Sequence, residues 1–185
     1  FKGLYRLKLK AQGLKEFPVR WKDKQNKPSY SAIGDPPTNK ELIVKGTSCY
    51  NYYVLDHEFT TEDVTVMYTT NVKQASYYAY FGVINELVNV ESNCMCCNIK
   101  NAWYFQSNGT VHNNAVTTKL NPLEYSTIVN STELNTVLIR FSGKNKEVYF
   151  TVNDNEECGP YKLTGIKFRI VAGSCGTSNG KITIE

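Results

Sequence analysis

The chain has 185 residues, a mass of 21.0 kDa, 41% hydrophobic residues and 21% charged residues, which is typical of one globular domain with or without an appendage. Its densest apolar runs are about six residues long, whereas a membrane-spanning helix needs about 20, so a membrane span is excluded. The net charge of +4 is uneven, because residues 1–40 hold ten Lys and Arg against three acidic residues, and residues 41–185 hold eleven against fourteen.

The first segment is predicted to be a basic N-terminal strand and arm over residues 1–42. Residues 4–9 alternate imperfectly as a strand does, and four of the six prolines follow within residues 10–48, so we expect loops there. A basic arm is attracted to acidic surfaces such as nucleic acid, a membrane face or an acidic protein. Because Lys and Asn are abundant in the whole chain, we favour the simpler interpretation of a solvated Lys-rich segment.

The remaining residues, 43–185, are predicted to form one all-β domain. Segments rich in Val, Ile, Thr, Tyr and Phe occur at residues 49–55, 63–68, 77–84, 102–106, 137–141, 148–152, 167–171 and 181–184. Turn residues separate these segments, and the one candidate for a short helix, over residues 120–134, is weak. Short strands at this spacing are typical of an antiparallel β-sandwich made of two sheets.

The six cysteines leave the redox compartment open. They stand at positions 49, 94, 96, 97, 158 and 175. Thiols are favoured over disulfides, because a chain of this length needs no cross-links, and zinc is disfavoured because both histidines are far in sequence from residues 94–97. The glycosylation sequons at Asn108 and Asn130 are no more frequent than chance predicts. We expect a cytoplasmic protein, with a secreted protein as the alternative.

The residues that could carry catalysis do not form a recognisable constellation. His57 lies between Asp56 and Glu58, and in an extended segment both acids would leave the side of the imidazole, so a surface charge cluster is favoured over a catalytic dyad. Glu156 and Glu157 are adjacent and would point to opposite faces, which does not suit a glycosidase pair. We therefore expect neither enzymatic activity, nor a cofactor, nor a metal site.

The aromatic residues are concentrated around two predicted strands. Six tyrosines gather there, at positions 50, 52, 53, 77, 78 and 80. They suit either an aromatic binding surface or a sandwich core, and for Tyr78 and Tyr80, which share a face, the core is favoured. Nucleic-acid binding is disfavoured, because the basic residues lie in the arm and not on the strands that carry the aromatics.

One run of residues resembles a known family. The sequence Asn-Ala-Trp-Tyr-Phe-Gln-Ser-Asn-Gly-Thr-Val-His-Asn at 101–113 is similar to the Trp-aromatic-x-x-x-Gly-x-x-His-Asn segment of SPRY domains. Gly82-Val83 precedes it, as in the family's Gly-Val strand, and segments 135–141 and 147–153 resemble the family's paired strands. The resemblance covers about residues 49–184 and implies a β-sandwich of the concanavalin and SPRY type.

The resemblance also implies a function. SPRY domains are non-enzymatic modules that bind a peptide or protein partner through loops at one end of the sandwich. Carried over loosely, the binding rim would comprise Tyr77 and Tyr78 together with a loop containing Gly173, Ser174 and Gly176. We then expect Tyr78→Ala to weaken partner binding without unfolding the chain.

Two alternatives of other classes stay open. A secreted glycan-binding protein on the related concanavalin-like fold would use Trp103 or an exposed Tyr as a stacking platform, with Asn108, Asn113 and Asn114 bonding the hydroxyls. A structural component of a larger assembly would dock its basic arm on an acidic neighbour.

Overall fold

The computed structural model describes residues 21–23, 41–45, 51–70, 79–89, 99–106, 109–119, 135–153, 155–174 and 179–184. Within these ranges the chain forms thirteen β-strands and no helix. The strands are β1 (Trp21–Asp23), β2 (Glu41–Lys45), β3 (Asn51–Leu55), β4 (Asp63–Thr70), β5 (Ala79–Asn85), β6 (Ala102–Gln106), β7 (Thr110–Asn113), β8 (Val116–Lys119), β9 (Asn135–Ser142), β10 (Glu147–Val152), β11 (Cys158–Lys162), β12 (Phe168–Ser174) and β13 (Asn179–Ile184).

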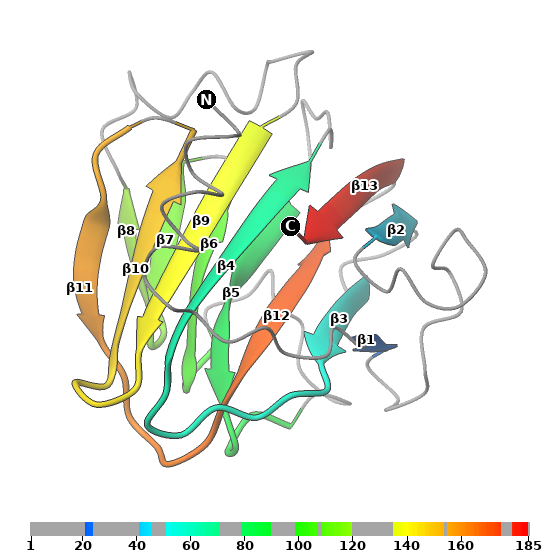
Figure 1. Cartoon of the computed structure of the whole chain (residues 1–185). Coiled ribbons are helices and arrows are strands. Elements are labelled where there is room, and N and C mark those ends of the chain that lie inside the picture. Colours follow the sequence, from blue (N-terminus) through cyan, green and yellow to red (C-terminus); the bar gives the residue numbers. More distant parts are fainter. Residues whose placement is uncertain are drawn as a thin grey trace.

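The strands form two antiparallel sheets that pack face to face (Figure 1). One sheet has seven strands in the order β1-β3-β12-β5-β6-β7-β8, and the other has six in the order β11-β10-β9-β4-β13-β2. All the strand pairs are antiparallel. The all-β sandwich predicted from the sequence is thereby confirmed.

The main core lies between the two sheets and is built by period-two alternation. In β4, Val64, Val66 and Tyr68 are buried against the other sheet, and Trp103 and Phe105 of β6 face them. Trp103, Phe105 and Tyr68 are fully buried. Because successive strand residues point to opposite faces, each of these strands places every second side chain in this core.

The seven-stranded sheet is buried on its outer face as well. Val54, Tyr80, Ile84, Tyr104 and Val171 form a second apolar cluster there. The neighbours Trp103 and Tyr104 thus serve two different clusters, one on each face of the sheet. A strand that is covered on both faces reads as a continuous apolar run, and all five residues of β6 are buried.

A close approach of two strands fixes this outer cluster. Gly82 of β5 pairs with Tyr104 of β6. A Cβ atom at Gly82 would lie 2.1 Å from the carbonyl oxygen of Trp103 and 2.4 Å from the Cβ of Tyr104. Glycine is therefore required at this position by the space left beside β6, not by backbone conformation.

The structure confirms the eight strands predicted after residue 43 and adds five others. β7 and β8 have four residues each, and β11 contains the dipeptide Gly159-Pro160, so neither length nor composition marks them as strands. β1 and β2 lie in the segment expected to be arm and loops, and they pair with β3 and β13. The expected strand at 4–9 and the candidate helix at 120–134 lie outside the described residues.

The predicted division of the chain falls within a strand. The boundary expected between residues 42 and 43 lies inside β2, which pairs with β13. Of the expected arm, the structure describes residues 21–23 and 41–42, and the division into an arm and a domain stays a prediction. In the part of the chain with described coordinates, no helix has the length and apolar character needed to cross a membrane.

Candidate binding surface at one end of the sandwich

Five strand connections meet at one end of the sandwich, which lies at the bottom of Figure 1. We call this surface the loop end. It consists of the described residues that follow β3, β5, β7, β9 and β11, namely 56–62, 86–89 with 99–101, 114–115, 143–146 and 163–167.

The large apolar side chains that are exposed in the described structure lie in the loop end or, for Val116, directly after it. They are Leu87, Val116 and Ile166, with exposed fractions of 68%, 62% and 70%. Ile166 precedes β12, Leu87 follows β5 and Val116 begins β8. Since the strand order is β12-β5-β6-β7-β8, the three residues lie in a line across the strand ends at one end of this sheet. We call them the apolar row.

A single buried asparagine ties the two loops that carry Leu87 and Ile166 to each other. The side-chain amide of Asn85 donates to the carbonyl oxygen of Thr164 over 2.7 Å and to Oδ1 of Asn101 over 3.2 Å. Its Oδ1 accepts from the backbone N–H of Leu87 over 2.9 Å. Asn85 is 3% exposed, and these contacts satisfy its amide, as burial requires.

The hydrogen bonds continue to the β7–β8 turn that precedes Val116. The backbone N–H of Asn101 donates to Oδ1 of Asn114 over 2.7 Å, and the N–H of Asn114 donates to the carbonyl of Ala102 over 3.0 Å. Asn114 and Ala115 form the two-residue hairpin loop with φ values of 50° and 72°. Positive φ at both positions is the geometry of a type I′ turn, whose twist matches that of the strands.

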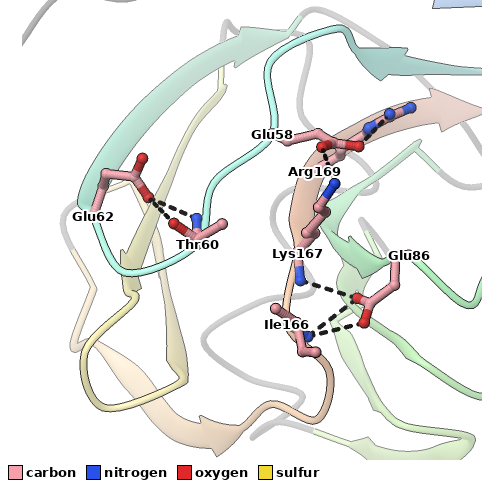
Figure 2. Close-up of polar contacts among 7 residues, drawn as sticks. All are labelled: Glu58, Thr60, Glu62, Glu86, Ile166, Lys167 and Arg169. Carbon is pink, nitrogen blue, oxygen red and sulfur yellow. Dashed lines mark hydrogen bonds and ion pairs between the residues drawn. The ribbon is translucent and has the colours of Figure 1, made fainter.

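Glu86 fastens the same two loops from the solvent side (Figure 2). Its carboxylate accepts from the N–H of Ile166 over 3.0 Å and from the N–H of Lys167 over 3.0 Å. Burial raises the pKa of Glu86, but the backbone donors outweigh burial, and the pKa is lowered from its ordinary value. The carboxylate therefore stays ionised between the two exposed apolar side chains.

A second carboxylate ties the β3–β4 loop to β12, also shown in Figure 2. Glu58 accepts from the guanidinium of Arg169 over 2.5 Å and pairs with the ammonium of Lys167 over 3.3 Å. The bond from Arg169 is the largest cause that lowers the pKa of Glu58. Phe59 and Phe168 exchange two backbone hydrogen bonds of 2.8 Å beside this ion pair. The sequence interpretation of residues 56–58 as a charge cluster agrees with this role of Glu58.

A third charge cluster lies on the outer face of the six-stranded sheet. Arg140 forms a bidentate bond with Glu157 over 2.9 and 2.6 Å, and its guanidinium carbon lies 3.7 Å from the ring centroid of Tyr149. The hydroxyl of Tyr149 donates to Glu147, which also pairs with Lys162. These charges satisfy one another across β9, β10 and β11, an arrangement that stabilises a sheet face.

Of the residues predicted as the binding rim, Gly173 and Ser174 are described, and they lie at the opposite end of the sandwich. Gly173 and Ser174 are the last residues of β12, not part of a loop, and they pair with Tyr80 and Ala79 of β5. Gly173 is buried. Tyr77, Tyr78 and Gly176 lie outside the described residues, so their binding role stays a prediction.

The burial of two aromatic residues tests two further predictions from the sequence. Trp103 is completely buried, so the suggestion that it serves as an exposed stacking platform is wrong. Tyr80 is also completely buried, which confirms its predicted place in a core.

Cys158 is present as a thiol whose Sγ lies 3.8 Å from the carbonyl oxygen of Glu156. Among the residues with described positions, no three His, Cys, Asp or Glu side chains gather as a metal site requires.

The apolar row carries no signal in the sequence. An isolated Leu, Val or Ile at a strand end reads the same whether it enters the core or faces solvent. The clue that was available is the clustering of Asn and Glu at 85–86, since a short polar side chain after a strand often bonds neighbouring backbone.

Comparison with solved structures shows which known proteins share this fold. No family model matches the sequence, and no curated protein matches it. Among solved structures, the SPRY domain of human HERC1 matches with a TM-score of 0.57 and 12% identity over 80% of this chain and 89% of that domain. The PSpry domain of TRIM65 matches with a TM-score of 0.50 and 7% identity over 72% and 68% of the two chains.

A lectin-like protein matches to a similar degree. Arcelin-5, a lectin-like defence protein from Phaseolus vulgaris, has a TM-score of 0.51 and 7% identity over 92% of both chains. The resemblance to SPRY domains noted from the sequence is thereby confirmed at the level of structure, and the chain has the β-sandwich fold that SPRY domains share with lectin-like proteins.

Proposed function

We propose that the chain is a non-enzymatic recognition module that binds a peptide or protein partner through the loop end. The observation that carries the proposal is the apolar row, because Leu87, Val116 and Ile166 are all exposed at one end of one sheet. Singly exposed apolar side chains are ordinary, whereas several together mark interaction surfaces. The fold shared with SPRY domains supports the same reading.

The fixed geometry of the loops supports binding in a second way. Asn85 and Glu86 hold the loops of Leu87 and Ile166 together by four hydrogen bonds to backbone groups of residues 164, 166 and 167. A surface that is ordered before binding loses little conformational entropy when a partner arrives. Full burial of one Leu or Ile side chain contributes about 1.5–3 kcal/mol, so Leu87 and Ile166 together contribute about 3–6 kcal/mol against the entropic cost of association.

The test compares the loop end with the rim predicted from the sequence. A random peptide library displayed on phage is selected on the whole chain, and the affinity of the enriched peptides is measured for Leu87→Ser, Ile166→Ser and Tyr78→Ala. We expect each of the first two substitutions to weaken binding about tenfold or more, the loss of roughly 1.4 kcal/mol of apolar contact. Both keep the backbone N–H that the loop network uses. Glu156→Ser, at an exposed site between β10 and β11, is the control and should change nothing.

The opposite outcome is equally clear. If Tyr78→Ala weakens binding while Leu87→Ser and Ile166→Ser do not, the rim predicted from the sequence around Tyr77, Tyr78, Gly173, Ser174 and Gly176 is the site. In that case the loop end has no part in recognition.

A glycan-binding protein is the second candidate, favoured by the fold shared with the lectin-like arcelin-5. The two candidates differ in compartment, because a cytoplasmic module keeps its thiols reduced. We expect the intact mass after alkylation without reduction, on protein from its native source, to show six alkylated thiols and no glycan. Disulfides, or sugar on Asn108 or Asn130, would instead place the protein outside the cell and call for a glycan array.

A further inference from the structure

The carboxylates of the loop end are engaged by donors of the protein itself. Glu58 binds Arg169 and Lys167, and Glu86 binds two backbone N–H groups. Glu62 accepts from the N–H of Thr60 over 2.6 Å and from its hydroxyl over 3.1 Å (Figure 2). Each of these acids therefore serves the loops internally, and its hydrogen-bonding capacity is largely used within the chain.

The lysines of the loop end are in a different situation. Lys100 and Lys144 are exposed, and within the described structure neither forms an ion pair. Lys100 lies two residues before the start of β6, the strand between β5, which Leu87 follows, and β7 and β8. The ammonium of Lys146 donates a hydrogen bond to the carbonyl oxygen of Gly165 over 2.9 Å. Lys100, next to the apolar row, and Lys144, in the β9–β10 loop of the other sheet, are thus lysines that can pair with acidic groups of a partner.

We propose that the apolar row and its lysines bind a short, acidic, amphipathic protein segment, an inference that rests on the proposed function. Neighbouring strands lie about 4.8 Å apart, so the row from β12 to β8 spans about 19 Å, the reach of about six extended residues. Apolar side chains of the segment cover Leu87, Val116 and Ile166, and flanking Asp or Glu residues meet Lys100 and Lys144. Complementary charge of this kind selects partners and speeds association.

An anionic membrane fits the same surface less well. Glu86 stays ionised between Leu87 and Ile166, and Glu58 stays ionised beside Lys167, because hydrogen bonds lower both pKa values. A flat layer of anionic headgroups would bring negative charge against these carboxylates, whereas a segment of defined sequence can place its acids beside the lysines alone.

The test uses the peptides selected on the whole chain. We expect them to combine apolar residues with Asp or Glu, and their affinity to fall as NaCl rises from 50 to 500 mM, as screening of exposed charges requires. Lys100→Glu should weaken an acidic peptide about tenfold, and a peptide with Lys in place of its acid should recover the loss on the variant. Reversing the charge on both the protein and the peptide separates the ion pair of Lys100 with the peptide from any general effect of the substitution. Glu156→Lys, at an exposed site outside the loop end, is the charge control.

Each other outcome overturns a defined part of the account. Peptides that depend on Leu87 but are neutral or basic, and are indifferent to Lys100→Glu, leave the proposed function standing and overturn this inference. Peptides that depend on neither Leu87 nor Lys100 overturn both. Binding to vesicles of phosphatidylcholine and phosphatidylserine (4:1) that is lost in Leu87→Ser, with no peptide selected, replaces the protein segment by a membrane surface.

Discussion

At the scale of single residues, His112 is a titratable group buried on the outer face of the seven-stranded sheet. It is 5% exposed, and its ring stacks on Tyr104 with the centroids 4.4 Å apart and the planes 8° from parallel. Nδ1 lies 3.3 Å from the hydroxyl of Thr117. Burial lowers the pKa of His112 from 6.5 to about 4, so the imidazole is neutral in the folded chain at neutral pH.

His112 makes the stability of the fold depend on acid. The unfolded chain takes up a proton near pH 6.5 and the folded chain only near pH 4, so the contribution is complete above pH 6.5 and is lost as the pH falls from 6.5 towards 4. A shift of this size corresponds to about 3 kcal/mol. We expect urea unfolding to show a loss of about 2–3 kcal/mol between pH 7.5 and pH 4.5 that His112→Gln does not show.

The comparison with the variant removes the contribution of other groups. Glu58, Glu62 and Glu86 also have lowered pKa values, and they lose stabilisation in acid in both proteins. Equal losses in the wild type and in His112→Gln would mean that His112 takes up its proton without resistance, contrary to its burial against Tyr104.

At the scale of elements, the loop end depends on side chains that replace the hydrogen bonds of a sheet. Beyond the last strand residue, a backbone group has no partner across the sheet. Asn85, Glu86 and Asn114 provide side-chain partners for backbone groups of the loops that follow β5 and β11. Side-chain hydrogen bonds therefore join these loops to each other, although the loops are not strands.

Removal of the Asn85 side chain should loosen two loops at once. Asn85→Ala leaves the carbonyl of Thr164 and the N–H of Leu87 without this partner, and a buried group left unsatisfied costs about 1–3 kcal/mol. We expect chemical denaturation to show a loss in this range, together with weaker binding of the selected peptides. Asn155→Ala, which removes a bond of 2.9 Å to Val152 outside the loop end, should lose less stability and bind peptides normally.

If Asn85→Ala and Asn155→Ala bound the peptides equally well, the order of the loop end would be irrelevant to recognition. The proposed function would then lose its argument from preorganised loops and would rest on the apolar side chains alone.

The elements differ in how far the sequence predicts them. β4, β9 and β10 have six to eight residues with clear alternation, and period two identifies such strands without further information. β7 and β8 have four residues and are joined by Asn114-Ala115, which lacks the glycine of the usual hairpin signal. The pairing of β7 with β8 depends on the contact of β7 with β6, which the local sequence does not reveal.

At the scale of the whole molecule, the fold class follows from the sequence and the binding surface does not. Alternating strands require two sheets that bury one face of each against the other. The outer cluster around Tyr104 and Val171 and the apolar row of Leu87, Val116 and Ile166 depend instead on which strand edges the topology brings together. Chain segments more than 70 residues apart, such as Asn85 and Thr164, meet there only after the sheets have formed.

The central claim is that recognition takes place at the loop end. Hydrogen–deuterium exchange of the whole chain, with and without a selected peptide, tests this claim directly. We expect the peptide to slow exchange at residues 85–89 and 163–167, and to leave residues 153–157 and 171–174 unchanged, because the latter lie outside the loop end. Protection of residues 171–174, with none at 85–89 and 163–167, would contradict the claim and place recognition at the opposite end of the sandwich.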